Sequence, residues 1–173
     1  VRGGAGGLVL SRALLAEAPA DLRNRLLAQA LIFVSGAEYR PRYQSLADLW
    51  TRIGQDKRHT LMGCLILPRK AELWVLREPA AALAAPAVAV GQVWDGRWHV
   101  SGPQGEVRAL GEAGLAECPD WRATGLPRPA LLSSPALWQG ARLIAAPLAG
   151  KTAGSRAEPI KSDDDFFNSL ILH

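Results

Sequence analysis

The chain has 173 residues, of which 49% are hydrophobic, and carries 20 Lys and Arg against 16 Asp and Glu, a formal net charge of +4 at pH 7. A chain of this size can bury a real core as one large domain or two small ones. No apolar run reaches the roughly 20 residues that cross a bilayer, and Cys64 and Cys118 form neither a CxxC pattern nor a disulfide framework. We therefore expect a cytoplasmic protein with two reduced thiols, no metal site and no membrane contact.

The positive charge is concentrated in the first half of the chain. Residues 1–80 hold 12 Lys and Arg against 7 Asp and Glu, whereas residues 81–173 hold 8 against 9. A partner that carries phosphates is therefore expected to meet the first half. Because Val1 opens the chain and Met62 is its only methionine, we also expect the sequence to be part of a longer protein.

The first predicted elements are a flexible lead-in and a short helix. Residues 3–7 are rich in glycine, but a phosphate-binding loop needs a preceding strand and a Lys-Ser/Thr ending, and neither is present. Residues 8–17 are expected to form a short helix that ends before Pro19. No cofactor-binding residue is predicted in this stretch.

Two longer helices are expected next. The spacing of Leu22, Leu26 and Val34 predicts a core-facing helix that starts at Asp21 and ends before Gly36. A second helix is predicted from near Ser45, where Ser45 and Asp48 resemble a capping box, to Gly54. In the loop between them, Pro41 holds Arg40 in an extended conformation.

A β-hairpin is predicted to follow the helices. Residues 60–67 and 72–77 are apolar runs separated by Pro68-Arg69-Lys70-Ala71, the composition of two strands and a turn. Residues 1–79 are thus expected to form a helix-helix-hairpin module. Exposed basic residues stand at its connections and are the predicted RNA-binding residues: Arg40, Arg42, Lys57, Arg58, Arg69 and Lys70.

The composition changes after Pro79. Residues 80–87 are mostly alanine with a proline and are expected to form a linker. Residues 88–173 are predicted to be a small, mainly β module, in which Asp95-Gly96 makes a two-residue hairpin turn and residues 149–165 are mobile. The expected fold class is α+β.

The sequence offers no convincing catalytic set. His59, His99 and His173 are not accompanied by a Gly-x-Ser-x-Gly elbow. The acidic run of residues 163–165 lacks the interleaved ligands of a calcium loop. No catalytic residue is therefore predicted.

One stretch of the first half carries a family resemblance. Its residues, in order, are Ala30-Leu31, Val34-Ser35-Gly36, Tyr39-Arg40-Pro41-Arg42, Leu46, Leu49, Thr60-Leu61-Met62-Gly63-Cys64 and Arg77-Glu78-Pro79. In order and spacing they resemble the region after the catalytic domain of bacterial tRNA(Ile)-lysidine synthetases, the MesJ-type PP-loop ATP pyrophosphatases. The likeness is best over residues 21–79 and softer over residues 94–148.

The resemblance implies a role in tRNA processing. Enzymes of this family are ligases that use ATP to adenylate the wobble cytidine of tRNA(Ile), after which lysine displaces AMP. Their downstream domains help to hold and select the tRNA. The nucleotide-binding signature Ser-Gly-Gly-x-Asp-Ser is absent from this sequence. We therefore expect a chain that is inactive alone, binds tRNA(Ile), and leaves ATP and lysine to a catalytic domain outside it.

Three other interpretations stay open at this point. A protein-interaction module would use exposed tryptophans as anchors, here Trp74, Trp94, Trp98 and Trp138. A generic RNA-binding domain would bind any structured RNA equally. A free-standing enzyme would need a deep polar pocket with perturbed ionisable groups.

Overall fold

The computed structural model describes residues 1–172, whose helices and antiparallel sheets confirm the predicted α+β class. The chain divides into two compact units. The first unit consists of Val1–Arg77 and the terminal segment that begins at Lys161, and the second of Glu78–Ile160. No helix of the described residues is long and apolar enough to cross a membrane.

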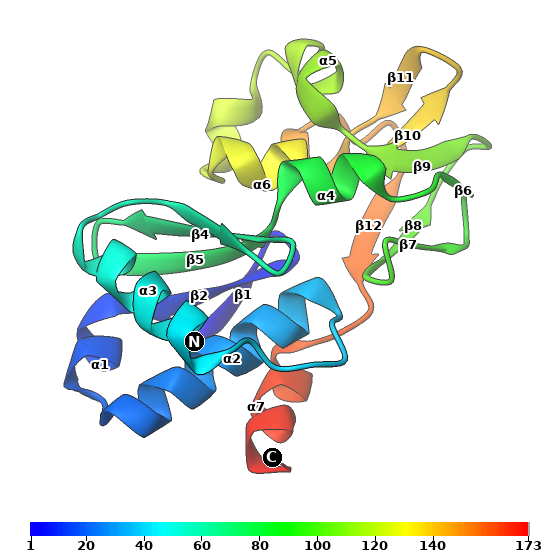
Figure 1. The fold of residues 1–173 in the computed structure, drawn as a ribbon. Helices are drawn as coiled ribbons and strands as arrows, with labels where there is room; N and C mark the ends of the chain where they lie inside the picture. Colours follow the sequence, from blue (N-terminus) through cyan, green and yellow to red (C-terminus); the bar gives the residue numbers. More distant parts are fainter. Residues whose placement is uncertain (173) are drawn as a thin grey trace. The chain divides into compact units, whose positions relative to one another are not determined.

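The first unit is a five-stranded antiparallel sheet with helices, in the strand order β1-β2-β5-β4-β3. Its strands are β1 (Arg2–Gly4), β2 (Gly7–Ser11), β3 (His59–Leu61), β4 (Cys64–Arg69) and β5 (Glu72–Arg77). Its helices are α1 (Arg12–Glu17), α2 (Ala20–Ser35), α3 (Tyr43–Gly54) and α7 (Asp163–Ile171). Figure 1 shows α2 and α3 on the same side of this sheet.

One apolar core joins the helices of the first unit to the sheet. Leu31 of α2 and Leu49 of α3 are fully buried in it against Ile66 of β4 and Leu73 of β5. The helix α7 closes the core with Phe166, whose ring meets Phe33 edge-on at 5.5 Å between centroids. This packing fixes α3 along the sheet, beside the edge strand β3.

Two predictions for the first unit are wrong. Residues 8–11, predicted as helix, belong to the strand β2, because the turn Ala5-Gly6 has positive φ at both residues and pairs β2 with β1. Residues 60–67 are not one strand, because Met62-Gly63 forms a second such turn between β3 and β4. Two-residue turns with positive φ join strands tightly, so the sheet gains strands that hydrophobicity alone does not reveal.

The predicted capping box of α3 is also absent. The helix begins at Tyr43, with Arg42 as N-cap and no side-chain capping bond, and Ser45 lies in its first turn. A capping box forms instead at α7, between Ser162 and Asp165.

The second unit contains two antiparallel sheets. One has the strand order β11-β10-β9-β6 and the other β12-β8-β7. Its strands are β6 (Val88–Ala89), β7 (Val93–Trp94), β8 (Trp98–Ser101), β9 (Glu106–Ala109), β10 (Pro135–Gln139), β11 (Arg142–Ala145) and β12 (Arg156–Pro159). Its helical segments are α4 (Pro79–Ala84), α5 (Gly111–Ala116), η1 (Trp121–Thr124), α6 (Arg128–Leu132) and η2 (Pro147–Ala149).

The two units depart from the predicted module boundaries. The predicted linker, residues 80–87, lies largely in α4 (Pro79–Ala84), whose Ala82 is buried with Val107 in a core of the second unit. The terminal segment from Lys161, predicted as part of the second module, belongs to the first unit, because Phe166 completes that unit's core. Residues 149–165 include β12 and the start of α7, and their mobility stays a prediction.

Candidate nucleic-acid interface

The first pair of predicted RNA-binding residues lies in the loop between α2 and α3. Gly36, in the left-handed conformation, ends α2 and donates its N–H to the Ile32 carbonyl. Pro41 is half-buried, whereas Arg40 and Arg42 are exposed. Within residues 1–172 neither guanidinium forms an ion pair or a side-chain hydrogen bond, and Asp48 accepts a hydrogen bond from Gln44 instead. Both charges are therefore available to an external anion.

The other four basic residues lie together beyond the opposite end of α3. Lys57 and Arg58 follow the helix, Arg69 is the last residue of β4, and Lys70 is the first residue of the turn between β4 and β5. All four are exposed, and within the described part of the chain none forms an ion pair with a carboxylate. The strand pairing places them near one another, because His59 pairs with Ile66 and Arg69 with Glu72 on neighbouring strands.

Arg12 holds this end of the unit together. Its guanidinium donates to the Lys70 carbonyl at 3.0 Å and to the Ile53 carbonyl at 3.2 Å. It also forms an ion pair with Asp56, with 2.6 Å between Nη2 and Oδ1. One side chain from the start of α1 therefore fixes the end of α3 against the β4–β5 turn.

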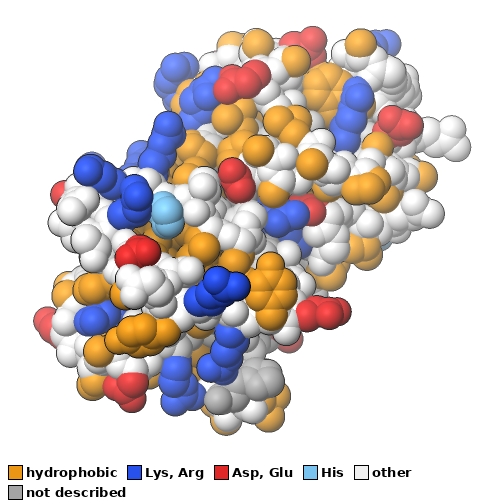
Figure 2. Space-filling model, viewed as in Figure 1, with side chains coloured by type: hydrophobic (Ala, Val, Ile, Leu, Met, Phe, Trp, Pro, Cys, Tyr) orange, Lys and Arg blue, Asp and Glu red, His pale blue; other side chains and the backbone are white. Residues whose placement is uncertain are grey.

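The six predicted residues thus form two basic groups, one at each end of α3. The helix has 12 residues, which corresponds to a length of about 18 Å. We call Arg40 and Arg42 the loop pair, and Lys57, Arg58, Arg69 and Lys70 the turn cluster. In Figure 2, Lys and Arg side chains gather over the part of the first unit that carries α3 and the β4–β5 turn.

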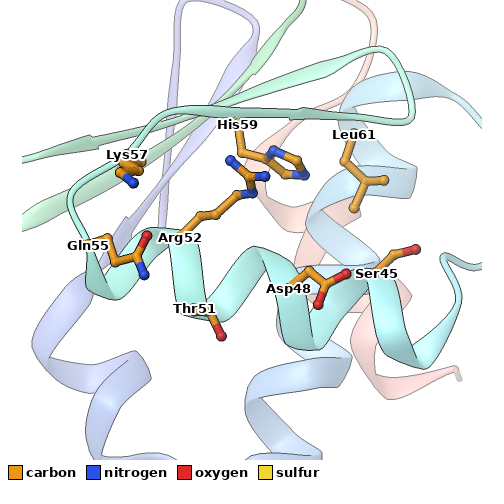
Figure 3. A pocket seen from close by; sticks show the side chains of 8 residues that line it. All are labelled: Ser45, Asp48, Thr51, Arg52, Gln55, Lys57, His59 and Leu61. Atoms are coloured by element: carbon orange, nitrogen blue, oxygen red, sulfur yellow. The ribbon is translucent and has the colours of Figure 1, made fainter.

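A polar groove lies between α3 and the edge strand β3. Its volume is about 420 Å³, and the side chains that line it are Ser45, Asp48, Thr51, Arg52, Gln55, Lys57, His59 and Leu61. Figure 3 shows α3 forming one wall and β3 the other, with the Arg52 guanidinium beside the His59 ring. Since Ser45 lies in the first turn of α3 and Lys57 beyond its last, the groove runs from the end with the loop pair toward the turn cluster.

The electrostatics of the groove are set by Arg52 and His59. Burial lowers the pKa of His59 below its usual value, and the positive charge of Arg52 lowers it further, whereas Asp48 opposes the shift. His59 is therefore neutral at pH 7, and its imidazole can both donate and accept a hydrogen bond. The groove offers an anionic ligand the charges of Arg52 and Lys57.

Sequence reasoning did not identify Arg52 as a site residue. Ser45, Asp48, Arg52 and Gln55 recur at three- and four-residue spacing, which marks one polar face of a helix. That signal was present in the sequence. The strand β3, which faces this side of α3, was not predicted as a strand separate from β4, so nothing in the sequence indicated a groove.

The chemical groups outside the groove are structural. Cys64 is buried and its thiol donates to the Leu31 carbonyl, and burial raises the pKa of the Cys118 thiol. Among residues 1–172, no cluster of three or more His, Cys, Asp or Glu side chains could hold a metal ion.

The four tryptophans proposed as anchors for a protein partner, Trp74, Trp94, Trp98 and Trp138, are all buried. The interaction-module interpretation therefore loses its anchors.

Comparison with known proteins confirms the resemblance found in the sequence. The chain is 42% identical over 158 residues to a protein named tRNA(Ile)-lysidine synthase from Ruegeria pomeroyi. The match covers 90% of this chain and 38% of the relative, so the chain spans well under half of that protein's length. No protein-family model and no solved structure matches the chain.

Proposed function

We propose that this chain is the carboxyl-terminal, non-catalytic portion of a tRNA(Ile)-lysidine synthetase and that its first unit binds tRNA(Ile). The observation that carries the proposal is the 42% identity to tRNA(Ile)-lysidine synthase over 90% of the chain. In this account ATP and lysine are used by a catalytic domain outside the chain, in the cytoplasm, and the present residues hold the tRNA.

The surface of the first unit supports a role in RNA binding. The loop pair and the turn cluster place six exposed cations at the two ends of one helix, and none of them forms an ion pair among the described residues. Lys and Arg that are free of internal partners can neutralise phosphates, and this supplies most of the affinity of a protein for a nucleic-acid backbone. The groove adds Arg52 and the neutral His59 between the two groups.

The experiment that tests the proposal compares tRNA affinity and thermal stability in the same variants. Arg40→Ala and Arg42→Ala should each weaken the binding of tRNA(Ile) by about 1 kcal/mol, the value of a charge-assisted hydrogen bond. The melting temperature should hardly change, because exposed charges contribute little to folding. Arg142→Ala is the matched control, since Arg142 is an exposed arginine of the second unit.

Two results would contradict the proposal. Unchanged tRNA affinity in both loop variants would remove the loop pair from the interface. A lower melting temperature with unchanged affinity of the folded fraction would show that the arginines serve the fold. A generic RNA-binding domain is distinguished by competition, because unrelated tRNAs would then displace tRNA(Ile) equally well.

A further inference from the structure

Both tyrosines of the chain lie at the junction between α2 and α3, Tyr39 in the loop and Tyr43 as the first residue of α3. They flank the loop pair in the order Tyr39-Arg40-Pro41-Arg42-Tyr43. The two residues are 69% and 74% exposed, whereas all six tryptophans are buried or half-buried. Exposed aromatic surface is therefore concentrated beside the two unpaired arginines.

Nothing inside the described molecule uses these rings. Neither hydroxyl forms a hydrogen bond and neither ring contacts another ring or a cation within residues 1–172. A buried tyrosine normally has a partner for its hydroxyl and neighbours for its ring. Tyr39 and Tyr43 thus contribute little to the core, and their rings remain available to a ligand.

The backbone around the tyrosines is well supported. Gly36 closes α2 on one side, and Pro41 restricts the backbone at the centre of the loop. On the other side the Arg42 carbonyl accepts the Leu46 N–H at 3.2 Å, which begins α3, and Tyr43 is the first residue of that helix. A loop anchored at both ends loses less conformational freedom when a ligand binds.

Two guanidinium groups flanked by two aromatic rings match the chemistry of unpaired nucleotides. Each unpaired base has two faces that can stack on an aromatic ring, and each nucleotide carries one phosphate that can meet an arginine. In a duplex the bases are already stacked on one another, so their faces are not accessible to a tyrosine ring. The ligand that uses all four side chains is a single-stranded segment.

We propose that Tyr39 and Tyr43 stack on unpaired bases of RNA while Arg40 and Arg42 contact the adjacent phosphates. This inference rests on the proposed function, and it specifies that the loop binds a single-stranded segment and not a duplex. The groove begins at Ser45, in the same first turn of α3 as Tyr43. Its polar side chains can therefore receive the nucleotides that follow.

The test uses the full 173-residue chain and three labelled RNA probes in a fluorescence anisotropy titration. The probes are a single strand of about 12 nucleotides, within the site size of single-strand binders, the same strand with abasic positions, and a duplex of the same sequence. The variants are Tyr39→Ala and Tyr43→Ala, with Tyr39→Phe and Tyr43→Phe as matched controls, because phenylalanine keeps the stacking face and loses only the hydroxyl.

Each alanine variant should weaken binding of the intact single strand by about tenfold, the loss of one stacked base. The phenylalanine variants should stay within about twofold of the parent chain. The alanine substitutions should not change the affinity for the abasic strand or the duplex. Equal losses with the abasic strand, no loss with the intact strand, or no binding of the intact strand by the parent chain would each overturn the inference.

Failure of the stacking inference can be distinguished from failure of the proposed function. If the arginine variants weaken tRNA binding while the tyrosine variants leave the single strand unaffected, only the stacking inference fails. If neither set of variants changes binding of any RNA, the interface itself is wrong.

Discussion

At the scale of single residues, the pKa of His59 depends on the burial and the charges of the groove. Its pKa is lowered first by burial and then by Arg52, so the folded state disfavours the protonated ring. The unfolded chain then binds more protons near the usual histidine pKa of about 6.5. The contribution of His59 to the free energy of unfolding is therefore fully present above that pH and is lost as the pH falls below it.

Substitution of the charges around His59 should shift its pKa in opposite directions. Arg52→Gln removes a positive charge and should raise the pKa, whereas Asp48→Asn removes a negative charge and should lower it. Both shifts can be measured by following the imidazole C–H resonances in an NMR pH titration. A pKa that does not respond to Arg52→Gln would show that the guanidinium does not lie beside the ring in solution.

At the scale of elements, Arg12 decides how α3 meets the sheet. It connects the start of α1 with the last turn of α3 and with the turn between β4 and β5. These contacts join segments that are distant in the sequence, and they set the position of the turn cluster. Removal of the guanidinium loses both hydrogen bonds and the ion pair with Asp56 together, although the Ile53 carbonyl still accepts the Asp56 N–H.

Arg12→Ala should therefore lower the free energy of unfolding by about 2 kcal/mol, measured by urea denaturation. Arg2→Ala is the matched control, because Arg2 makes an exposed ion pair with Glu72 on the same sheet. Exposed pairs contribute little, so its loss should be clearly smaller. Equal effects of the two substitutions would contradict the bridging role of Arg12.

The elements that could be predicted from sequence are those with local signals. The helices α2 and α3 follow from apolar periodicity. Asp95-Gly96 has the expected positive φ angles, but the hairpin loop has a third residue, Arg97, because Trp94 pairs with Trp98. The strand β2 was missed because the turn to its neighbour β1 has no typical hairpin sequence and its other partner, β5, lies more than 60 residues away. An apolar run such as Leu8-Val9-Leu10 is equally compatible with a buried helix until such a partner is known.

The candidate site shows the same division between local and distant information. The sequence places basic residues at connections and so indicates which cations are exposed. The predicted helix already separates Arg40 and Arg42 from Lys57 and Arg58. The sequence does not show that Arg69 and Lys70 join the latter two, since that depends on the register of β3 against β4. The exposure of Tyr39 and Tyr43 likewise depends on what packs around the loop, which no local pattern reports.

At the scale of the whole molecule, the chain returns to the first unit after it has completed the second. Phe166 is the fully buried residue of the terminal segment, and its ring packs against Phe33. Phe166→Ala should lower the free energy of unfolding of the first unit by about 3 to 5 kcal/mol, because it leaves a cavity in the core. Native-state hydrogen exchange should then show faster exchange in α2, whose Leu31 lies in the same core.

Phe167→Ala is the control for that substitution, since the neighbouring ring is 43% exposed. Its effect should be small, because little apolar surface returns to water. If Phe166→Ala and Phe167→Ala reduce stability equally, the terminal segment does not complete the core of the first unit.

The salt dependence of tRNA(Ile) binding tests most directly whether the two basic groups at the ends of α3 bind the tRNA backbone. Each phosphate contact should contribute roughly 0.7 to 0.9 to the slope of log K against log salt. The double variants Arg40→Ala/Arg42→Ala and Lys57→Ala/Arg58→Ala should each reduce that slope by roughly 1.5, and Arg142→Ala should leave it unchanged. A slope that stays the same in both double variants would contradict the account.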